Sequence, residues 1–286
     1  MDQYAVMGNP IQHSFSPLIH QLFAEQTQQV LNYQAIQVPL DQLPQALNFF
    51  ENHQGKGVNI TLPFKSEAFH LVDRCTDRAM QARAINTIQF NEDGTWLGDN
   101  TDGVGLVTDL SINHHYVITG KRILILGAGG AVRGILGPLQ KKNPFIIMVA
   151  NRTLDKAEQL ASEFCTLGNI QACSIEALPH QDSFDLIIHA TSLSLQKESL
   201  ALPETILAPE TFCYDLAYGQ EPTPFLNWSS QRGISFLSDG LGMLIEQAAE
   251  SFYLWRGIRP DTKEIKSKLF FLNSDTFRLN AQTTFY

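Results

Sequence analysis

The sequence lacks the residue patterns that define several classes of protein. Its four cysteines show no CxxC spacing, which argues against a disulfide framework and favours reduced thiols. Its eight histidines form no HxxxH or HxxEH pattern, so we predict no metal site. No apolar run approaches the roughly 18 residues needed to span a bilayer, and the first residues do not resemble a signal peptide. These absences predict a cytoplasmic protein.

Basic residues are also in deficit, with 20 Lys and Arg against 29 Asp and Glu, for a net charge of −9. A protein of that sign repels phosphate backbones and anionic lipid surfaces, so we expect neither nucleic acid nor a membrane as a partner. The composition, 44% hydrophobic and 17% charged, is typical of a globular protein, and the 286 residues are enough for two domains.

Strand and helix patterns alternate over the first third of the chain. Ser16 is the expected N-cap of the first helix, with Pro17 in its first turn. A hairpin is predicted where "AINTIQF" and "TWLG" flank the turn "NEDG", so this sheet should contain strands of both directions. The other predicted elements are strands at 4–9, 31–38 and 57–62 and helices at 16–26 and 40–52.

The second part of the chain contains near-continuous apolar strands, which are typical of a parallel sheet covered on both faces. They lie within 121–130, 143–153, 184–192, 211–219 and 233–240, with a helix at 154–164. We therefore predict an α/β protein with two domains. A substrate-binding domain with a mixed sheet spans 1–104, and a doubly wound Rossmann domain spans 105–239. A helix at 240–257 should cross back, so that 240–286 completes the first domain.

Glycines follow the first apolar strand in the segment "ILILGAGGAVRG". Gly127, Gly129 and Gly130 lie where the strand turns into a helix, and there a backbone without side chains can approach a pyrophosphate. The motif alone is weak, because the bulky Val132 occupies its third small position.

The next strand indicates which dinucleotide binds. It ends in Asn151-Arg152-Thr153, where a domain that binds NAD usually places an acidic residue. A guanidinium at this point attracts a 2′-phosphate that a carboxylate would repel. The predicted cofactor is therefore NADP.

Polar clusters in the first domain are not explained by an apolar core. The stretch "GVNITLPFK" carries Asn59 and Thr61 on one face of a strand, and Lys65 follows on the next turn. Three more clusters are "GNPIQHSFSP", "AINTIQF" and "GDNTDG". Taken singly, each is explained as well by caps and turns as by a ligand site.

Taken together, these segments resemble the shikimate dehydrogenase family of aromatic amino-acid biosynthesis, over roughly Tyr4 to Pro260. The resemblance rests on the order and spacing of "MGNPIQHSFSP", "GVNITLPFK", "AINT", "GDNTDG", "GAGGA", "NRT", "ATS" and "DGLGMLIEQAAESF". It implies reversible reduction of 3-dehydroshikimate to shikimate by NADPH. It also implies an active site in the cleft between two α/β domains and a homodimer.

The resemblance assigns roles to individual residues. Lys65 and Asp102 would be the catalytic pair. The substrate would be bound by Ser14, Ser16, Asn59, Thr61, Asn86, Tyr218 and Gln247. The cofactor would be bound by Gly127, Ala128, Gly129, Gly130, Ala131, Asn151, Arg152, Thr153, Ala190, Thr191, Ser192, Gly240 and Met243.

Two departures from the family pattern lie near the expected nicotinamide site. His189 stands where the family often has asparagine, and Ser194 stands where it often has glycine. A related quinate/shikimate dehydrogenase would be expected to favour NAD, which Arg152 argues against. A non-catalytic shikimate sensor would not need Lys65 and Asp102, and paired serines do not suggest a folate-linked dehydrogenase.

Overall fold

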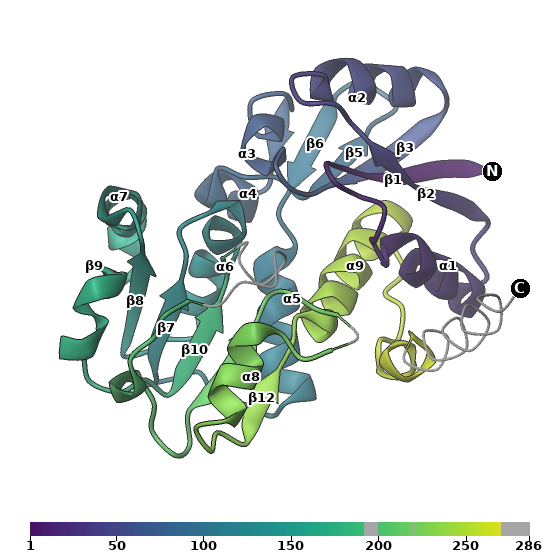
Figure 1. Ribbon diagram of the computed structural model, residues 1–286. Coiled ribbons are helices and arrows are strands. Elements are labelled where there is room, and N and C mark those ends of the chain that lie inside the picture. The colour runs from purple at the N-terminus through teal and green to yellow at the C-terminus, as the bar shows by residue number, and fades with distance from the viewer. Residues whose placement is uncertain (192–199, 220, 270–286) are drawn as a thin grey trace, which may run out of the picture.

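The computed structural model describes residues 1–191, 200–219 and 221–269, which fold around two six-stranded sheets (Figure 1). The first sheet has the strand order β2-β1-β3-β5-β6-β4. Its parallel pairs are β1–β2, β1–β3 and β4–β6, whereas β5 runs antiparallel to β3 and β6. The predicted mixed sheet and hairpin are thus confirmed. The strands are β1 (Asp2–Gly8), β2 (Leu31–Gln37), β3 (Gly55–Ile60), β4 (Arg74–Cys75), β5 (Thr87–Phe90) and β6 (Trp96–Asp99).

Four helices lie between residues 16 and 82 of this first lobe, and one detail of the sequence prediction is wrong. Ser16 is the first residue of its helix rather than the cap; Phe15 occupies the cap position and no side chain caps the helix. Pro17 lies in the first turn as predicted, where its missing N–H costs no hydrogen bond. The helices are α1 (Ser16–Thr27), α2 (Leu43–Asn52), α3 (Lys65–Ala68) and α4 (Asp77–Ala82).

The second sheet, with the order β12-β11-β10-β7-β8-β9, is parallel throughout. Alternate residues of β7 enter separate cores on its two faces, Ile123 and Ile125 on one and Leu124 and Leu126 on the other. This confirms the doubly wound fold. The elements of this second lobe are β7 (Arg122–Leu126), α6 (Gly130–Gln140), β8 (Ile146–Asn151), α7 (Leu154–Phe164), β9 (Ile170–Ser174), β10 (Leu186–His189), β11 (Phe212–Asp215), α8 (Pro224–Ser230) and β12 (Phe236–Ser238), with short 3-10 turns at Cys165–Leu167, Ile175–His180 and Glu204–Ile206.

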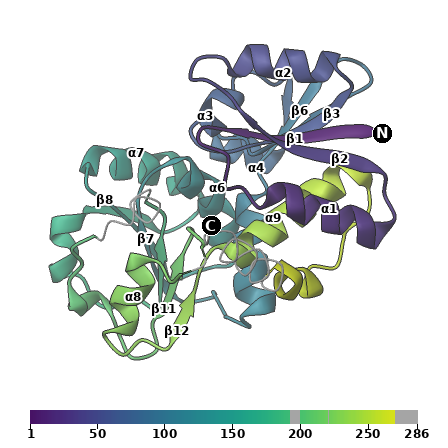
Figure 2. The same cartoon turned by 45° about the vertical axis from the view of Figure 1, so that its right-hand side comes forward.

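Two helices run between the lobes, α5 (Asp102–Thr108) and α9 (Leu241–Arg256), and they pack against each other (Figure 1). Figure 2 shows α9 beside α1, between the two sheets. A π-helical turn, Asp109–Asn113, continues α5. α9 also contacts α1, β3 and β5, while α5 contacts α6, so the pair joins the two lobes. The predicted domain boundary at 104/105 falls inside α5, and the tail 270–286 lies outside the described residues. None of the described helices is long and apolar enough to cross a membrane.

Candidate active site

Lys65 and Asp102 meet in the structure although 37 residues separate them. The Lys65 Nζ donates to Asp102 Oδ2 at 2.6 Å, and the two side chains are only 14% and 5% exposed. Little water surrounds the pair, so the attraction between ammonium and carboxylate is stronger than on an open surface. The structure therefore brings together the two residues that the resemblance implies as a catalytic pair.

The stretch after β3 explains how Lys65 reaches this position. Past the end of β3, the Thr61 N–H still donates to Met7 O, at 2.9 Å. The chain then turns, and Phe64, which is 2% exposed, anchors the start of α3 in the core. Ile85 N–H donates to Lys65 O at 2.8 Å, which fixes the backbone from the other side. Lys65 thus has a rigid backbone and a side chain directed at Asp102.

Asp102 lies at the end of a loop in which each residue makes specific hydrogen bonds. The Asn100 amide donates to Ala84 O at 2.8 Å, and its Oδ1 accepts from the Asp102 N–H at 3.2 Å. Thr101 N–H donates to Asn86 Oδ1 at 2.9 Å. Such a loop holds the Asp102 carboxylate in one orientation.

Asn86 binds the second carboxylate oxygen of Asp102. Its Oδ1 accepts from Thr101 N–H and from the Thr87 hydroxyl, which fixes the orientation of the amide. The Nδ2 atom then lies 2.8 Å from Asp102 Oδ1 and 3.2 Å from Gln247 Oε1. Asn86, Asp102, Gln247 and Lys65 therefore form one polar group, in which Asn86 immediately precedes β5 and the other three lie on α5, α9 and α3.

Asn59 lies behind this group rather than in it. Its Oδ1 accepts from the Tyr33 hydroxyl at 2.7 Å, and its Nδ2 lies within 3.1 Å of Asn86 O, Thr87 Oγ1 and Ser251 Oγ. Burial raises the pKa of Tyr33 well above its usual value, so that phenol is a donor. With these partners and 6% exposure, Asn59 supports the backbone of Asn86. Both of its amide atoms are thus engaged within the protein.

Ser251 is a residue of this region that the sequence reasoning missed. Its Oγ donates to Gln247 O at 3.0 Å and lies 2.8 Å from Thr87 Oγ1 and 3.2 Å from Thr101 Oγ1. The sequence does place Ser251 one turn after Gln247, on the same face of the predicted helix. That position alone does not reveal which polar groups Ser251 contacts. Through Thr87 and Thr101, Ser251 connects α9 to the residues that directly follow Asn86 and precede Asp102.

The Ser14–Ser16 loop and Tyr218 come together from the two lobes. Ser14 Oγ accepts from the Ser16 N–H at 3.3 Å, which leaves the Ser14 hydroxyl hydrogen available. The Phe15 ring lies 5.6 Å from the Tyr218 ring. Burial raises the pKa of Tyr218 to about 12, so its phenol is protonated at neutral pH and can donate. Thr61 is half-buried beside Gly8.

The glycine turn of the second lobe faces Lys65. A Cβ on Gly130 would lie 3.8 Å from Lys65 Cβ and 4.0 Å from Ser66 Oγ. Gly127 needs to be glycine for conformational reasons, since its φ is +116°. Gly129 does not, because its φ is −92° and a Cβ there would meet nothing within 4 Å. Open space beside a helix N-terminus suits a phosphate group that must approach the backbone closely.

Val132 explains why the glycine motif looked weak. It is fully buried in the core between α6 and the sheet, so this chain accommodates the larger residue by packing it.

The end of β8 presents free cations at the surface. Asn151 Nδ2 donates to Thr153 O at 2.8 Å, which shapes the turn, and Arg152 and Thr153 are exposed. Arg133 is already paired with Glu163 at 2.5 Å. Arg152 and Lys156, by contrast, form no ion pair with any residue that the structure describes. Lys156, four residues after Arg152 at the start of α7, was not predicted.

The remaining predicted cofactor residues lie on several elements, with Ala190 after β10 and Gly240 after β12. The space above Gly127 is bounded by Ala190, whose O would lie 3.1 Å from a Cβ on that glycine. A Cβ on Gly240 would be 2.1 Å from Leu216 O, so only glycine fits there. Met243 packs in the core of the second lobe. Ala128 and Ala131 belong to the glycine turn, whereas Ser192 and Ser194 lie outside the described residues.

His189 is buried at the end of β10. Its Nδ1 lies 3.3 Å from Asp215 Oδ1, its Nε2 lies 2.9 Å from Thr191 Oγ1, and its ring stacks on Phe225 at 5.0 Å. The residue that departs from the family pattern is therefore built into the packing of this strand end.

Three family models match the chain. They are described as the shikimate dehydrogenase substrate binding domain (residues 6–88), the shikimate/quinate 5-dehydrogenase (residues 110–215) and the shikimate 5'-dehydrogenase C-terminal domain (residues 240–270). Among curated relatives, the shikimate dehydrogenases (NADP(+)) of Cellvibrio japonicus and Aeromonas salmonicida are each 50% identical. Their alignments cover 94% of this chain, and 96% and 97% of the relatives.

Solved structures of the same fold include an Ael1 enzyme from Pseudomonas putida. It is 44% identical, with a TM-score of 0.87 over 94% of this chain and 98% of that one. Another is a shikimate 5-dehydrogenase from Thermus thermophilus in complex with NADP(H) and shikimate. It is 31% identical, with a TM-score of 0.81 over 92% of this chain and 96% of that one.

Proposed function

Because the chain belongs to the shikimate dehydrogenase family, we propose that Lys65 and Asp102 are the acid–base pair for the reversible reduction of 3-dehydroshikimate to shikimate. The chain is an NADP-dependent oxidoreductase. The observation that carries the proposal is the 2.6 Å contact between Lys65 and Asp102, made beside the glycine turn, where a Cβ on Gly130 would lie 3.8 Å from Lys65 Cβ. We further propose that 1–104 with 240–286 is the substrate domain and 105–239 the cofactor domain.

The two residues act on the same oxygen of the substrate. NADPH supplies the hydride when it is bound. As negative charge grows on the ring oxygen, the Lys65 ammonium stabilises it and donates the proton; in the reverse direction the neutral amine accepts that proton. Asp102 orients Lys65 and offsets the cost of a charged amine in a site with little water. Asn86 keeps the other oxygen of Asp102 in place.

We propose that a polyhydroxylated acid is held by groups around this pair. The Ser14 and Ser16 hydroxyls and the Tyr218 phenol are donors suited to a carboxylate. Thr61, Asn86 and Gln247 offer both donors and acceptors for ring hydroxyls. For Asn59 we propose a supporting role, because its amide atoms are already bonded within the protein.

We propose that the cofactor binds at the glycine turn and beside two exposed cations, Arg152 and Lys156, that form no ion pair with a described residue. The open space at Gly129 suits the pyrophosphate, and the helix N-terminus adds free N–H groups. Arg152 and Lys156, with the Thr153 hydroxyl, would bind the 2′-phosphate. We propose that Ala190, Thr191, Gly240 and Met243 surround the nicotinamide.

Replacing Arg152 with alanine should raise the KM for NADPH by about 10–100-fold and leave the KM for NADH nearly unchanged. The expected loss corresponds to a charge-assisted hydrogen bond of roughly 1.5–3 kcal/mol. Steady-state kinetics with both cofactors measures it, with Lys142→Ala as a control for loss of an exposed cation. An equal rise for the two cofactors would show that Arg152 does not bind the 2′-phosphate.

Replacing Gly129 with alanine should weaken NADP binding by about tenfold or more without lowering the melting temperature. A methyl group there meets no protein atom within 4 Å, but it projects into the space proposed for the pyrophosphate. Titration of the cofactor by fluorescence, beside a thermal melt of the free protein, measures both quantities. Unchanged cofactor affinity would refute this placement.

One assay tests the activity against its nearest alternative. Absorbance of the reduced nicotinamide is followed with NADP or NAD, and with shikimate or quinate. We expect turnover with NADP and shikimate. A preference for quinate and NAD would instead identify a quinate/shikimate dehydrogenase of the same fold, and no turnover would indicate a sensor. Sedimentation of the full chain tests the homodimer that we propose from the family resemblance.

A further inference from the structure

Asp99 is a fully buried carboxylate three residues before Asp102. It accepts two hydrogen bonds from Arg78, from Nε to Oδ1 at 2.7 Å and from Nη2 to Oδ2 at 2.5 Å. Oδ1 also accepts from the Thr76 hydroxyl and from the Asn100 N–H. Two parallel bonds from a planar guanidinium fix both the position and the plane of a carboxylate. Arg78 therefore fixes the last residue of β6, from which the loop leads to Asp102.

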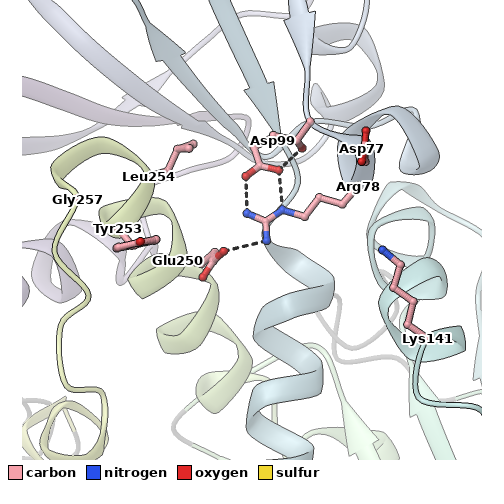
Figure 3. A pocket seen from close by; sticks show the side chains of 9 residues that line it. Asp77, Arg78, Asp99, Lys141, Glu250, Tyr253, Leu254 and Gly257 are labelled. Carbon is pink, nitrogen blue, oxygen red and sulfur yellow. Dashed lines mark hydrogen bonds and ion pairs between the residues drawn. The ribbon is translucent and has the colours of Figure 1, made fainter.

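The same guanidinium also reaches α9. Arg78 Nη1 donates to Glu250 Oε1 at 2.9 Å, and Figure 3 shows the guanidinium between Asp99 and Glu250. Glu250 lies three residues after Gln247, and Arg259 pairs with its second oxygen. Burial lowers the pKa of Arg78, but Asp99 and Glu250 raise it by more, so the group stays charged. One side chain thus joins the Asp102 loop to the helix that carries Gln247.

Arg78 makes these contacts away from the proposed substrate. It lines a hollow of about 540 Å³, bounded also by Asp77, Lys141, Tyr253, Leu254 and Gly257. None of the residues proposed to bind substrate or cofactor lines this hollow. Any effect of Arg78 on turnover must therefore pass through the residues that it holds.

We propose that Arg78 is a positioning residue for the reaction: by binding Asp99 and Glu250 together, it sets Asp102 against Lys65 and aligns Gln247 with them. This inference rests on the proposed roles of Lys65 and Asp102. Without Arg78, the buried Asp99 would keep only a hydroxyl and an N–H as partners, and the loop would move to hydrate the carboxylate. A displacement of about 1 Å at a catalytic group can cost on the order of 100-fold in rate.

The test is a double-mutant cycle between Arg78→Ala and Asp102→Asn. We expect Arg78→Ala to lower kcat by about 10–100-fold while the KM for NADP changes by less than about threefold. In the Asp102→Asn background, the same change should cost less than about threefold, because the group that it positions is already disabled. If the two fold-losses of kcat instead multiply in the double variant, the proposal is overturned. A general loss of folded protein would lower kcat by the same factor with Asp102 and with Asn at that position.

Further arms keep the result interpretable. Arg78→Lys keeps a positive charge beside the buried Asp99, which favours a folded protein. A lysine cannot reproduce the paired hydrogen bonds of a guanidinium, so this variant should also lower kcat. An unchanged kcat would refute the proposal. Because Arg78 lines an open hollow, guanidinium at a non-denaturing concentration should restore part of the turnover of Arg78→Ala, whereas urea should not. Failure of this rescue counts against the proposal.

Arg74→Ala is the matched control. Arg74 lies in the same lobe, is 64% exposed, and among the described residues forms an ion pair only with the exposed Asp93, so its loss should leave kcat unchanged. The Asp102→Asn variant alone reports on the proposed acid–base pair, so failure of that assignment is distinguishable from failure of the role given to Arg78.

Discussion

Replacing Lys65 with alanine should lower kcat for shikimate oxidation by about 10²–10⁴-fold, the usual contribution of proton transfer by a positioned side chain. Substrate affinity should change little, because the serine loop, Asn86 and Gln247 remain. Steady-state kinetics in both directions, with substrate binding measured by calorimetry, separates the two effects.

A matched lysine controls for the loss of charge. Lys56, on β3 of the same lobe, is exposed and outside the polar group, so Lys56→Ala should retain normal turnover. Turnover of Lys65→Ala close to that of the unmodified protein would remove Lys65 from the mechanism.

Replacing Gly242 with alanine should destabilise the protein by about 2–4 kcal/mol, although glycine-to-alanine changes within helices usually stabilise them. A Cβ at this position of α9 would lie 2.0 Å from Asp109 Oδ1. Asp109 is fully buried and accepts from the Tyr214 hydroxyl at 2.7 Å. The methyl group would displace the carboxylate and leave a buried phenol unpaired. Thermal melts should show a decrease in Tm of roughly 4–16 °C.

The double variant with Asp109→Ala tests this cause. Once the carboxylate is gone, the methyl group has room, so Gly242→Ala should add almost no further loss in that background. Additive losses would mean that the clash with Asp109 is not the origin of the instability.

The architecture follows from sequence patterns where burial is regular. The helix predicted at 154–164 has the bounds of α7, because Ala157, Leu160, Ala161 and Phe164 repeat at helical spacing on its buried face. β9 was not predicted, since this edge strand buries only Ile170 and Cys173. Ser16 was wrongly expected to cap α1, because residue preference cannot tell the cap from the next position.

The candidate site could be predicted only in part. Lys65 and Asp102 were indicated by resemblance, since no periodicity brings residues 37 positions apart together. Arg78 and Ser251 were missed because their partners Glu250 and Thr87 lie 172 and 164 positions away. Asn59 was predicted to bind substrate, from its place on one face of a strand and from the family resemblance. Its partners, which decide between ligand and support, are fixed only by packing.

In the proposed domain division, both members of the acid–base pair belong to the substrate domain, with Asp102 at the first residue of α5, whereas the glycine turn belongs to the second lobe. A rigid-body displacement of one lobe would therefore change the distance between a bound cofactor and the substrate, across which hydride would transfer. The distance between the Lys65 ammonium and the Asp102 carboxylate would stay constant. The distance for hydride transfer and the distance for proton transfer can therefore change independently. Isotope effects measured with deuterated cofactor report on the geometry between the lobes. Isotope effects measured in heavy water report on proton transfer at Lys65.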